Sequence, residues 1–154
     1  MPGPTTPALG RDLLATYRVT DGRYEDLDVS TGGQAVRGDL VEDLQVVAGV
    51  DNAVQAVIHR IKTVQGELAG LGHPDYGSRH HFLVGQPNTV RNRNLVKLFI
   101  LQALAFEPRI RKVLKADVVP DPQPDRVTIA LTLSFVDAPG ATDLVVPFNL
   151  GGPA

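Results

Sequence analysis

The chain has 154 residues, of which 43% are hydrophobic and 21% are charged, a length and composition that suit one domain with a short extension. The formal net charge of −2 argues against nucleic acid as the main partner, because phosphate binding needs a clustered excess of Lys and Arg. Cysteine is absent, which excludes disulfides, thiolate metal sites and cysteine nucleophiles, and suits a cytoplasmic protein.

Residues 1–40 are predicted to form a flexible or extended N-terminal arm. The first ten residues carry three prolines and no apolar period, and they lack the basic start and apolar stretch of a secretory signal. The rest of the arm is rich in glycine, with one short strand expected at residues 27–29. No apolar run in the sequence approaches the roughly 20 residues that cross a bilayer, so no membrane insertion is expected.

A folded domain is predicted over residues 41–150, followed by a short tail at residues 151–154. It should begin with a short strand at residues 44–47 and continue into a helix, for which Asp51 is a suitable N-cap and Gly66 a natural stop. Apolar residues recur there at helical spacing. They are Val50, Val54, Val57, Ile58, Ile61 and Val64.

Residues 67–77 hold more glycines and a proline, which predicts a structured loop. Ser78 can then cap a short helix that runs through Val84. Asn88 can cap the longest helix, at about residues 89–106, which Pro108 ends because its ring cannot continue the hydrogen-bond ladder. The buried stripe predicted for this helix comprises Leu95, Leu98, Phe99, Gln102 or Leu101, and Ala105.

Beyond Pro108 the apolar period changes from 3.6 to 2, which predicts strands. Leu114, Ala116 and Val118 should share one face of the first strand. The clearest alternation spans residues 127–135, and a last strand is expected near residues 144–148, where Pro147 indicates an edge. The predicted fold class is therefore α+β, with two layers: helices packed on a small C-terminal antiparallel β-meander.

Two segments stand out as candidate sites. In Glu107-Pro108-Arg109, the proline should hold a carboxylate and a guanidinium at a rigid corner, from which each could bind a partner across an interface. A surface ion pair within the chain is the alternative interpretation. The loop between Gly66 and Ser78 is either a binding lip or a support that seats the following helix. In that loop, Tyr76 can bury its ring while its hydroxyl finds a partner.

Three pieces of the sequence, in this order, resemble the baseplate wedge family of contractile phage tails. They are Gln65-Gly66-Glu67-Leu68, the run from His73 to Ser78, and Glu107-Pro108-Arg109-Ile110. The family includes the sheath-initiator subunits of phage-derived injection particles and the type VI secretion subunit TssE, and an early label for it was lysozyme-like. The resemblance extends over about Leu44 to Leu150. In the loop, the positions that match the family are Gly66, Glu67, Pro74, Tyr76, Gly77 and Ser78.

The resemblance implies a structural baseplate component that is not an enzyme and needs no cofactor. It implies that Glu107, Pro108 and Arg109 dock onto other baseplate wedge subunits. It also implies that the C-terminal sheet accepts strands of the contractile sheath protein and templates the first sheath ring. Six copies would surround the hub and tube proteins in a cytoplasmic particle. The residues expected to carry the strand exchange are Leu144, Val145, Val146 and Phe148.

Two other functions stay open. The first is a peptidoglycan hydrolase that uses Glu67 and Asp75, since a glycosidase needs two carboxyl groups about 5–10 Å apart. The chain has no Trp and few aromatics to stack on sugars, which disfavours this function. The second is a small regulatory adaptor protein that has borrowed this domain.

A metal site is not expected. His73, Asp75, His80 and His81 lie within nine residues, but their spacing matches no zinc motif. Because His80 and His81 are adjacent, they should point apart on a helix. The prediction is that His73 supports the loop and that one of His80 and His81 lies in solvent.

Overall fold

The structure, a computed structural model, describes residues 9–20, 23–29, 31–36 and 39–151. The chain divides into two compact units, one up to Gln55 and one from Ala56 onward, and the boundary falls within helix α1 (Gly49–Lys62). Each unit is described by itself. The predictions for residues 1–8 and for the tail at 152–154 fall outside the described residues.

The N-terminal unit is built from short antiparallel strand pairs. The pairs are β1 with β6, β2 with β3, and β4 with β5. The prediction of a strand at residues 27–29 is confirmed, but the other strands of residues 11–36 were not predicted, because this stretch lacks regular apolar alternation. The six strands are β1 (Arg11–Leu13), β2 (Ala15–Thr20), β3 (Arg23–Val29), β4 (Thr31–Val36), β5 (Asp39–Leu44) and β6 (Val46–Ala48).

The start of α1 is joined to β1 and to the residue Leu9 before it by side-chain amides. Asn52 Nδ2 donates a hydrogen bond to the Leu9 carbonyl at 2.7 Å, and Gln55 Nε2 donates to the Leu13 carbonyl at 2.8 Å. The helix begins at Gly49, so Asp51 is not its N-cap as predicted. Asp51 instead lies in the first turn, where its carboxylate still interacts favourably with the helix dipole.

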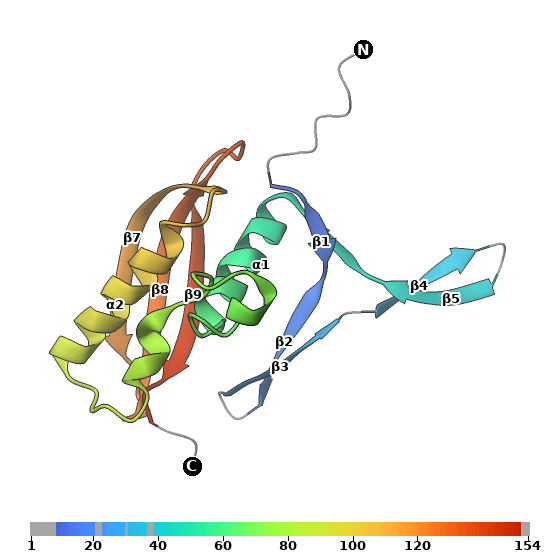
Figure 1. Cartoon of the computed structure of the whole chain (residues 1–154). Coiled ribbons are helices and arrows are strands. Elements are labelled where there is room, and N and C mark those ends of the chain that lie inside the picture. The colour runs from blue at the N-terminus through green and yellow to red at the C-terminus, as the bar shows by residue number, and fades with distance from the viewer. Residues whose placement is uncertain (1–8, 21–22, 30, 37–38, 152–154) are drawn as a thin grey trace. The chain divides into compact units, whose positions relative to one another are not determined.

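The C-terminal unit contains a three-stranded antiparallel sheet in the order β7-β8-β9, with α2 (Val90–Leu104) lying along one face of it (Figure 1). This arrangement confirms the α+β class with a C-terminal meander. β9 is an edge strand, as Pro147 indicated. The strands are β7 (Ile110–Pro120), β8 (Arg126–Phe135) and β9 (Thr142–Asn149).

The central strand β8 supplies one wall of the core. Its burial alternates strictly, in agreement with the predicted period of 2. Opposite it, the helices contribute apolar side chains that are almost fully buried. The buried residues of β8 are Val127, Ile129, Leu131, Leu133 and Phe135, and those of α1 and α2 in this unit are Val57, Ile61, Val96, Ile100, Ala103 and Leu104.

The predicted buried face of α2 is wrong. Leu98 is 47% exposed and Gln102 is also exposed, whereas Val96 and Ile100 are buried. Apolar side chains occur on several sides of this helix, so periodicity alone cannot select the side that contacts the sheet. The helix cap also differs from the prediction: the Thr89 hydroxyl accepts a hydrogen bond from Asn92 N at 3.2 Å.

Asn88, the predicted cap, instead connects α2 to the sheet. Its Nδ2 donates to the Pro124 carbonyl at 3.0 Å, and its Oδ1 accepts a hydrogen bond from Arg93 at 2.8 Å.

The predicted face of β7 is also partly wrong. Leu114 was expected to share a face with Ala116 and Val118, but Leu114 is 50% exposed while the other two are half-buried. The pairing of β7 with β8 shifts between Val113 and Lys115. Such an irregularity interrupts the alternation of side chains, and the sequence does not reveal it.

Candidate functional site

The segment from Glu107 to Arg109 connects α2 to β7, and its charged side chains form a fork. The Glu107 carboxylate accepts hydrogen bonds from Arg109 Nε at 2.6 Å and from Arg109 Nη2 at 3.2 Å. It also accepts one from the Arg109 amide at 3.3 Å. Since Pro108 restricts the backbone between the two residues, they are held in this side-on arrangement.

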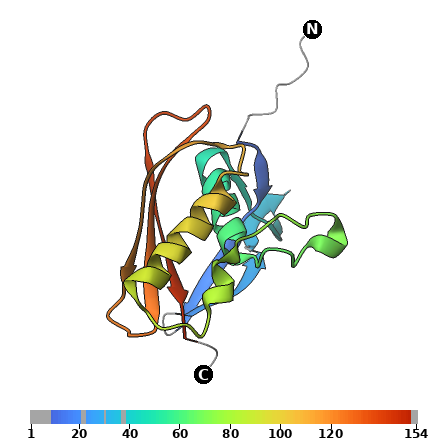
Figure 2. The ribbon, with the colours of Figure 1, turned by 60° about the vertical axis from the view of Figure 1, so that its left-hand side comes forward.

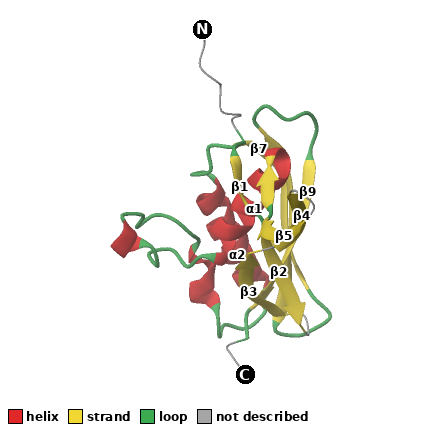
Figure 3. Cartoon of the chain, turned by 90° about the vertical axis from the view of Figure 1, so that its right-hand side faces the viewer, coloured by secondary structure: helices red, strands yellow, loops and turns green. Residues whose placement is uncertain are grey.

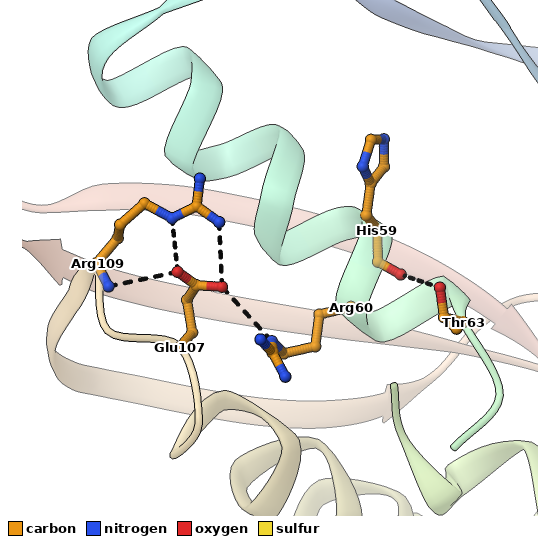
Figure 4. A network of polar contacts seen from close by, with 5 residues as sticks. All are labelled: His59, Arg60, Thr63, Glu107 and Arg109. Atoms are coloured by element: carbon orange, nitrogen blue, oxygen red, sulfur yellow. Dashed lines mark hydrogen bonds and ion pairs between the residues drawn. The ribbon is translucent and has the colours of Figure 1, made fainter. Parts of the chain in front are cut away.

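A second guanidinium lies against the same carboxylate. Arg60 of α1 places its Nε 3.5 Å from Glu107 Oε2, so that Glu107 lies between Arg60 and Arg109 (Figure 4). The Arg60 guanidinium also stacks on the ring of Tyr76, 4.4 Å from its centroid. The loop, α1 and the corner after α2 therefore meet at one buried carboxylate.

The Glu107 carboxylate is charged at neutral pH despite its burial. Burial by itself would raise its pKa, but the hydrogen bonds and charge of Arg109, together with the charge of Arg60, outweigh this and lower the pKa. The neighbouring Tyr76 hydroxyl has a raised pKa, chiefly because of burial. The site therefore contains one anion between two cations.

The sequence predicted that both charged side chains of the corner would face outward. The structure places Glu107 inside, with its side chain 2% exposed, while the side chain of Arg109 is 27% exposed. The contributions of Arg60 and of the stacked Tyr76 ring were not predicted. Nothing in the sequence signals them, since Arg60 lies 47 positions before Glu107 and is one of several polar residues of a helix whose apolar pattern continues beyond it.

The loop between Gly66 and Ser78 is closed at its base. The Ser78 amide donates to the Thr63 carbonyl at 2.9 Å, and the Gln65 amide donates to the Ser78 carbonyl at 3.2 Å. The loop contains the 3₁₀ turn η1 (Ala69–Leu71) and stands away from the helices of its unit (Figures 2 and 3). Leu71 at this turn is 76% exposed.

The predicted loop residues therefore separate into a base and a tip. Gly77 and Ser78 are buried at the base, Tyr76 is half-buried beside Arg60, and Gly66, Glu67 and Pro74 are exposed. The Glu67 carboxylate accepts a hydrogen bond from the Val64 amide at 3.2 Å. This placement supports the interpretation that the base seats the following segment.

Ser78 caps the short helix predicted after it, which is the 3₁₀ helix η2 (Arg79–Leu83). The prediction that His80 or His81 lies in solvent is wrong. His80 is 1% exposed and its Nδ1 lies 2.8 Å from Ser78 Oγ, while His81 Nε2 donates to the Ile61 carbonyl at 2.9 Å. Both rings pack edge-on against Phe148 of β9, at 4.4 and 5.6 Å between centroids.

These histidines make stability depend on pH. Burial lowers the pKa of His80 to about 2, and burial also lowers the pKa of His81. The unfolded chain binds protons below pH 6.5 that the folded chain excludes, so stability is full above that pH and falls below it. For His80 we expect a loss of about 1.4 kcal/mol for each pH unit below 6.5, and His81 adds a loss of the same sign. Urea unfolding at pH 7.5 and pH 5.5 would measure this loss.

The matched substitutions are His80→Gln and His73→Gln, since His73 is exposed. The first should reduce the pH dependence of the free energy of unfolding between pH 7.5 and 5.5 by more than the second does, because only His80 of the two is buried. If the free energy of unfolding of His80→Gln depended on pH as strongly as that of the wild type, the proposed effect of His80 on stability would be wrong.

An open pocket of about 450 Å³ lies beside the base of the loop. Asp75 and Arg79 line it from the loop side, and Phe99, Gln102 and Phe106 line it from α2 and the residues that follow. Glu67, the other carboxylate considered for hydrolysis, is not among the lining residues. The structure therefore does not bring the two carboxylates together around this pocket.

The described part of the chain holds no cluster of three or more His, Cys, Asp or Glu side chains suited to a metal ion. Within the same ranges, none of the helices has both the length and the apolar character needed to span a membrane.

The last strand, β9, carries the residues predicted for strand exchange. Val146 is buried and Val145 is 59% exposed. Leu144 and Phe148 are half-buried, and Phe148 is covered by the two histidines. Pro147 lies opposite Thr128 with no break in the register, so its nitrogen faces the free edge of the sheet rather than β8.

No family model matches the chain, and no curated protein matches it. Among solved structures, the chain is similar to a crystal structure from Geobacter sulfurreducens that is described as a candidate tail lysozyme. The TM-score is 0.58 at 23% sequence identity, and the match covers 68% of this chain and 94% of that one. At this level of identity the similarity shows a shared fold.

Proposed function

We propose that this protein is a structural component of the baseplate of a contractile, tail-like injection machine. The observation that carries the proposal is the corner at Glu107-Pro108-Arg109, where a buried carboxylate holds Arg109 at the surface. The three motifs that resemble the wedge family support it, because two of them meet here through Tyr76 and Glu107. The tail assignment in the description of the Geobacter structure agrees with it.

In this function, Arg109 and the corner dock onto other wedge subunits, and the edge of β9 accepts strands of the sheath protein. Six copies surround the hub and tube in a particle that is assembled in the cytoplasm. The domain transmits a rearrangement of the wedges to the sheath. Rigidity suits this role, and the buried ion pairs supply it by connecting α1, the loop and the sheet.

Substituting Arg109 by Ala is expected to leave the protein folded and to block particle assembly, because the exposed part of the fork is lost. Electron microscopy of particles from the native host would count sheathed assemblies, and circular dichroism would check the fold. Arg91→Ala is the matched control, since Arg91 is exposed on α2 and makes no ion pair among the described residues. Normal sheathed particles from Arg109→Ala would contradict the docking role.

Strand exchange is best tested at Val145. Neighbouring residues of a strand direct their N–H groups to opposite edges, so the Val145 N–H faces the same free edge as the Pro147 nitrogen. Val145→Pro should therefore remove a donor from the free edge without breaking the ladder to β8. We expect baseplates that form without polymerised sheath, as scored by electron microscopy. A deletion from Pro147 to the end of the chain would be harder to interpret than this substitution. It would also remove Leu150, which is 1% exposed and belongs to the core.

The control for this prediction is Val145→Ala, which shortens the same side chain and keeps the donor. Full-length sheath on Val145→Pro particles would show that this edge does not template the sheath.

A second candidate function is peptidoglycan hydrolysis, which the description of the Geobacter structure and the position of Asp75 beside the pocket favour. The test is whether purified protein clears peptidoglycan, and whether Glu67→Gln and Asp75→Asn abolish the clearing. If the wild-type protein cleared peptidoglycan and both variants failed to do so, an enzymatic function would replace the structural one.

A further inference from the structure

The two guanidiniums at the corner carry more charge than the protein neutralises. Arg60 and Arg109 both contact the single carboxylate of Glu107, so the cluster has an excess of one positive charge. The Glu107 side chain is 2% exposed and that of Arg60 is 10% exposed, whereas that of Arg109 is 27% exposed. The excess positive charge of the cluster is therefore most accessible at Arg109.

Some N–H donors of the Arg109 guanidinium bind Glu107 within the protein, and others face away from it. A guanidinium has five N–H donors. Glu107 occupies the edge formed by Nε and Nη2, at 2.6 and 3.2 Å. Among the described residues, Nη1 makes no hydrogen bond. The end of the guanidinium, formed by Nη1 and the second N–H of Nη2, is therefore available for a second bidentate partner.

The surface beside Arg109 has the same sign of charge. Arg111 and Lys112 at the start of β7 are exposed, and neither forms an ion pair within the described ranges. The amide of Val136 donates to the Arg109 carbonyl at 2.9 Å, which brings Asp137 to the same end of the sheet. Asp137 nevertheless forms no ion pair with Arg109 in this structure. The surface is complementary to an acidic segment.

We infer that the corner accepts a carboxylate of a partner protein, an Asp or Glu side chain in an acidic segment, on the outer end of the Arg109 guanidinium. Glu107 and Arg60 act as positioning residues that fix the orientation of Arg109 before the partner arrives. A preset guanidinium loses less side-chain entropy on binding than a free one. This inference rests on the proposed docking role of the corner and adds the chemistry of the partner.

The test uses hexaglutamate as the probe and hexalysine as its counterpart, with the full chain labelled with ¹⁵N. Titration should shift the Nε–Hε resonance of Arg109 with hexaglutamate and not with hexalysine. Arg109→Gln should weaken hexaglutamate binding about tenfold, the loss of one charge-assisted pair. Arg109→Lys keeps the charge but lacks the fork of donors. Its affinity for hexaglutamate should therefore lie between those of the wild type and Arg109→Gln. Raising the salt concentration should weaken binding to the wild-type protein.

Arg91→Gln is the matched control and should bind like the wild type. Equal loss in Arg91→Gln and Arg109→Gln would overturn the inference, because binding would then reflect general surface charge. Unchanged binding in Arg109→Gln would overturn it as well. Particle assembly is scored separately: an assembly defect with unchanged peptide binding leaves the docking role in place without its carboxylate chemistry. Normal assembly with lost peptide binding removes the docking role itself.

Discussion

Replacing Glu107 by Gln is expected to lower the free energy of unfolding by about 3 kcal/mol, in the range observed when one partner of a buried ion pair is removed. The variant keeps the shape of the side chain but leaves the guanidiniums of Arg60 and Arg109 without an anion. Arg60 is 8% exposed, so water cannot fully replace the lost carboxylate. Urea unfolding followed by circular dichroism at pH 7 would measure the difference.

The pH dependence of this effect has a definite sign. Because the pKa of Glu107 is lowered from 4.5, its contribution is present above that pH and is lost as the pH falls. The difference between wild type and Glu107→Gln should therefore shrink in acid. Asp117→Asn is the control, since the Asp117 side chain is 41% exposed and pairs with Lys97 and Lys115 at the surface. It should cost at most about 1 kcal/mol. Equal costs for both substitutions would contradict a buried role for Glu107.

Replacing Gly77 by Ala should also cost about 3 kcal/mol, for two reasons that add. Gly77 has a φ of +98°, which side chains rarely adopt. A Cβ at this position would also lie 2.6 Å from the Thr63 carbonyl oxygen and 2.9 Å from the Val64 carbonyl carbon. Both of those atoms belong to the backbone, so relief requires the base of the loop to open. Thermal or urea unfolding would detect the loss.

Gly70 provides the matched control in the same loop. A Cβ at Gly70 would meet open space, and its φ is not positive. Gly70→Ala should therefore be neutral or slightly stabilising, because alanine restricts the unfolded chain. If Gly77→Ala were as stable as Gly70→Ala, the close approach at the base of the loop would not be a constraint of the fold.

The parts of the fold that could be predicted are those in which neighbouring residues in the sequence allow only one local structure. The alternation of residues 127–135 predicted β8 with each buried side chain correct, because a period of 2 can place only one face against the core. Pro108 predicted that the long helix stops before it, and α2 ends at Leu104, two residues before the predicted end. Pro147 indicated an edge strand, because proline lacks the N–H that an interior position needs. The cap at Ser78 followed from the same local reasoning.

The parts that could not be predicted depend on residues far apart in the sequence. The side of α2 that meets the sheet was mispredicted at Leu98 and Gln102, because a helix with apolar residues on several sides can be buried in several orientations. The shift at Val113 and the strands of the N-terminal unit depend on pairing partners that no local pattern identifies.

The candidate site shows the same division. The sequence alone determined that Glu107, Pro108 and Arg109 form a rigid charged corner, because the proline and the residue types are sufficient for that conclusion. Only the tertiary structure decided that Glu107 turns inward and Arg109 outward. The reason is Arg60, which reaches the carboxylate from α1 while its guanidinium stacks on the ring of Tyr76. A buried carboxylate is stable only where several donors converge on it, and that convergence is a property of the folded chain.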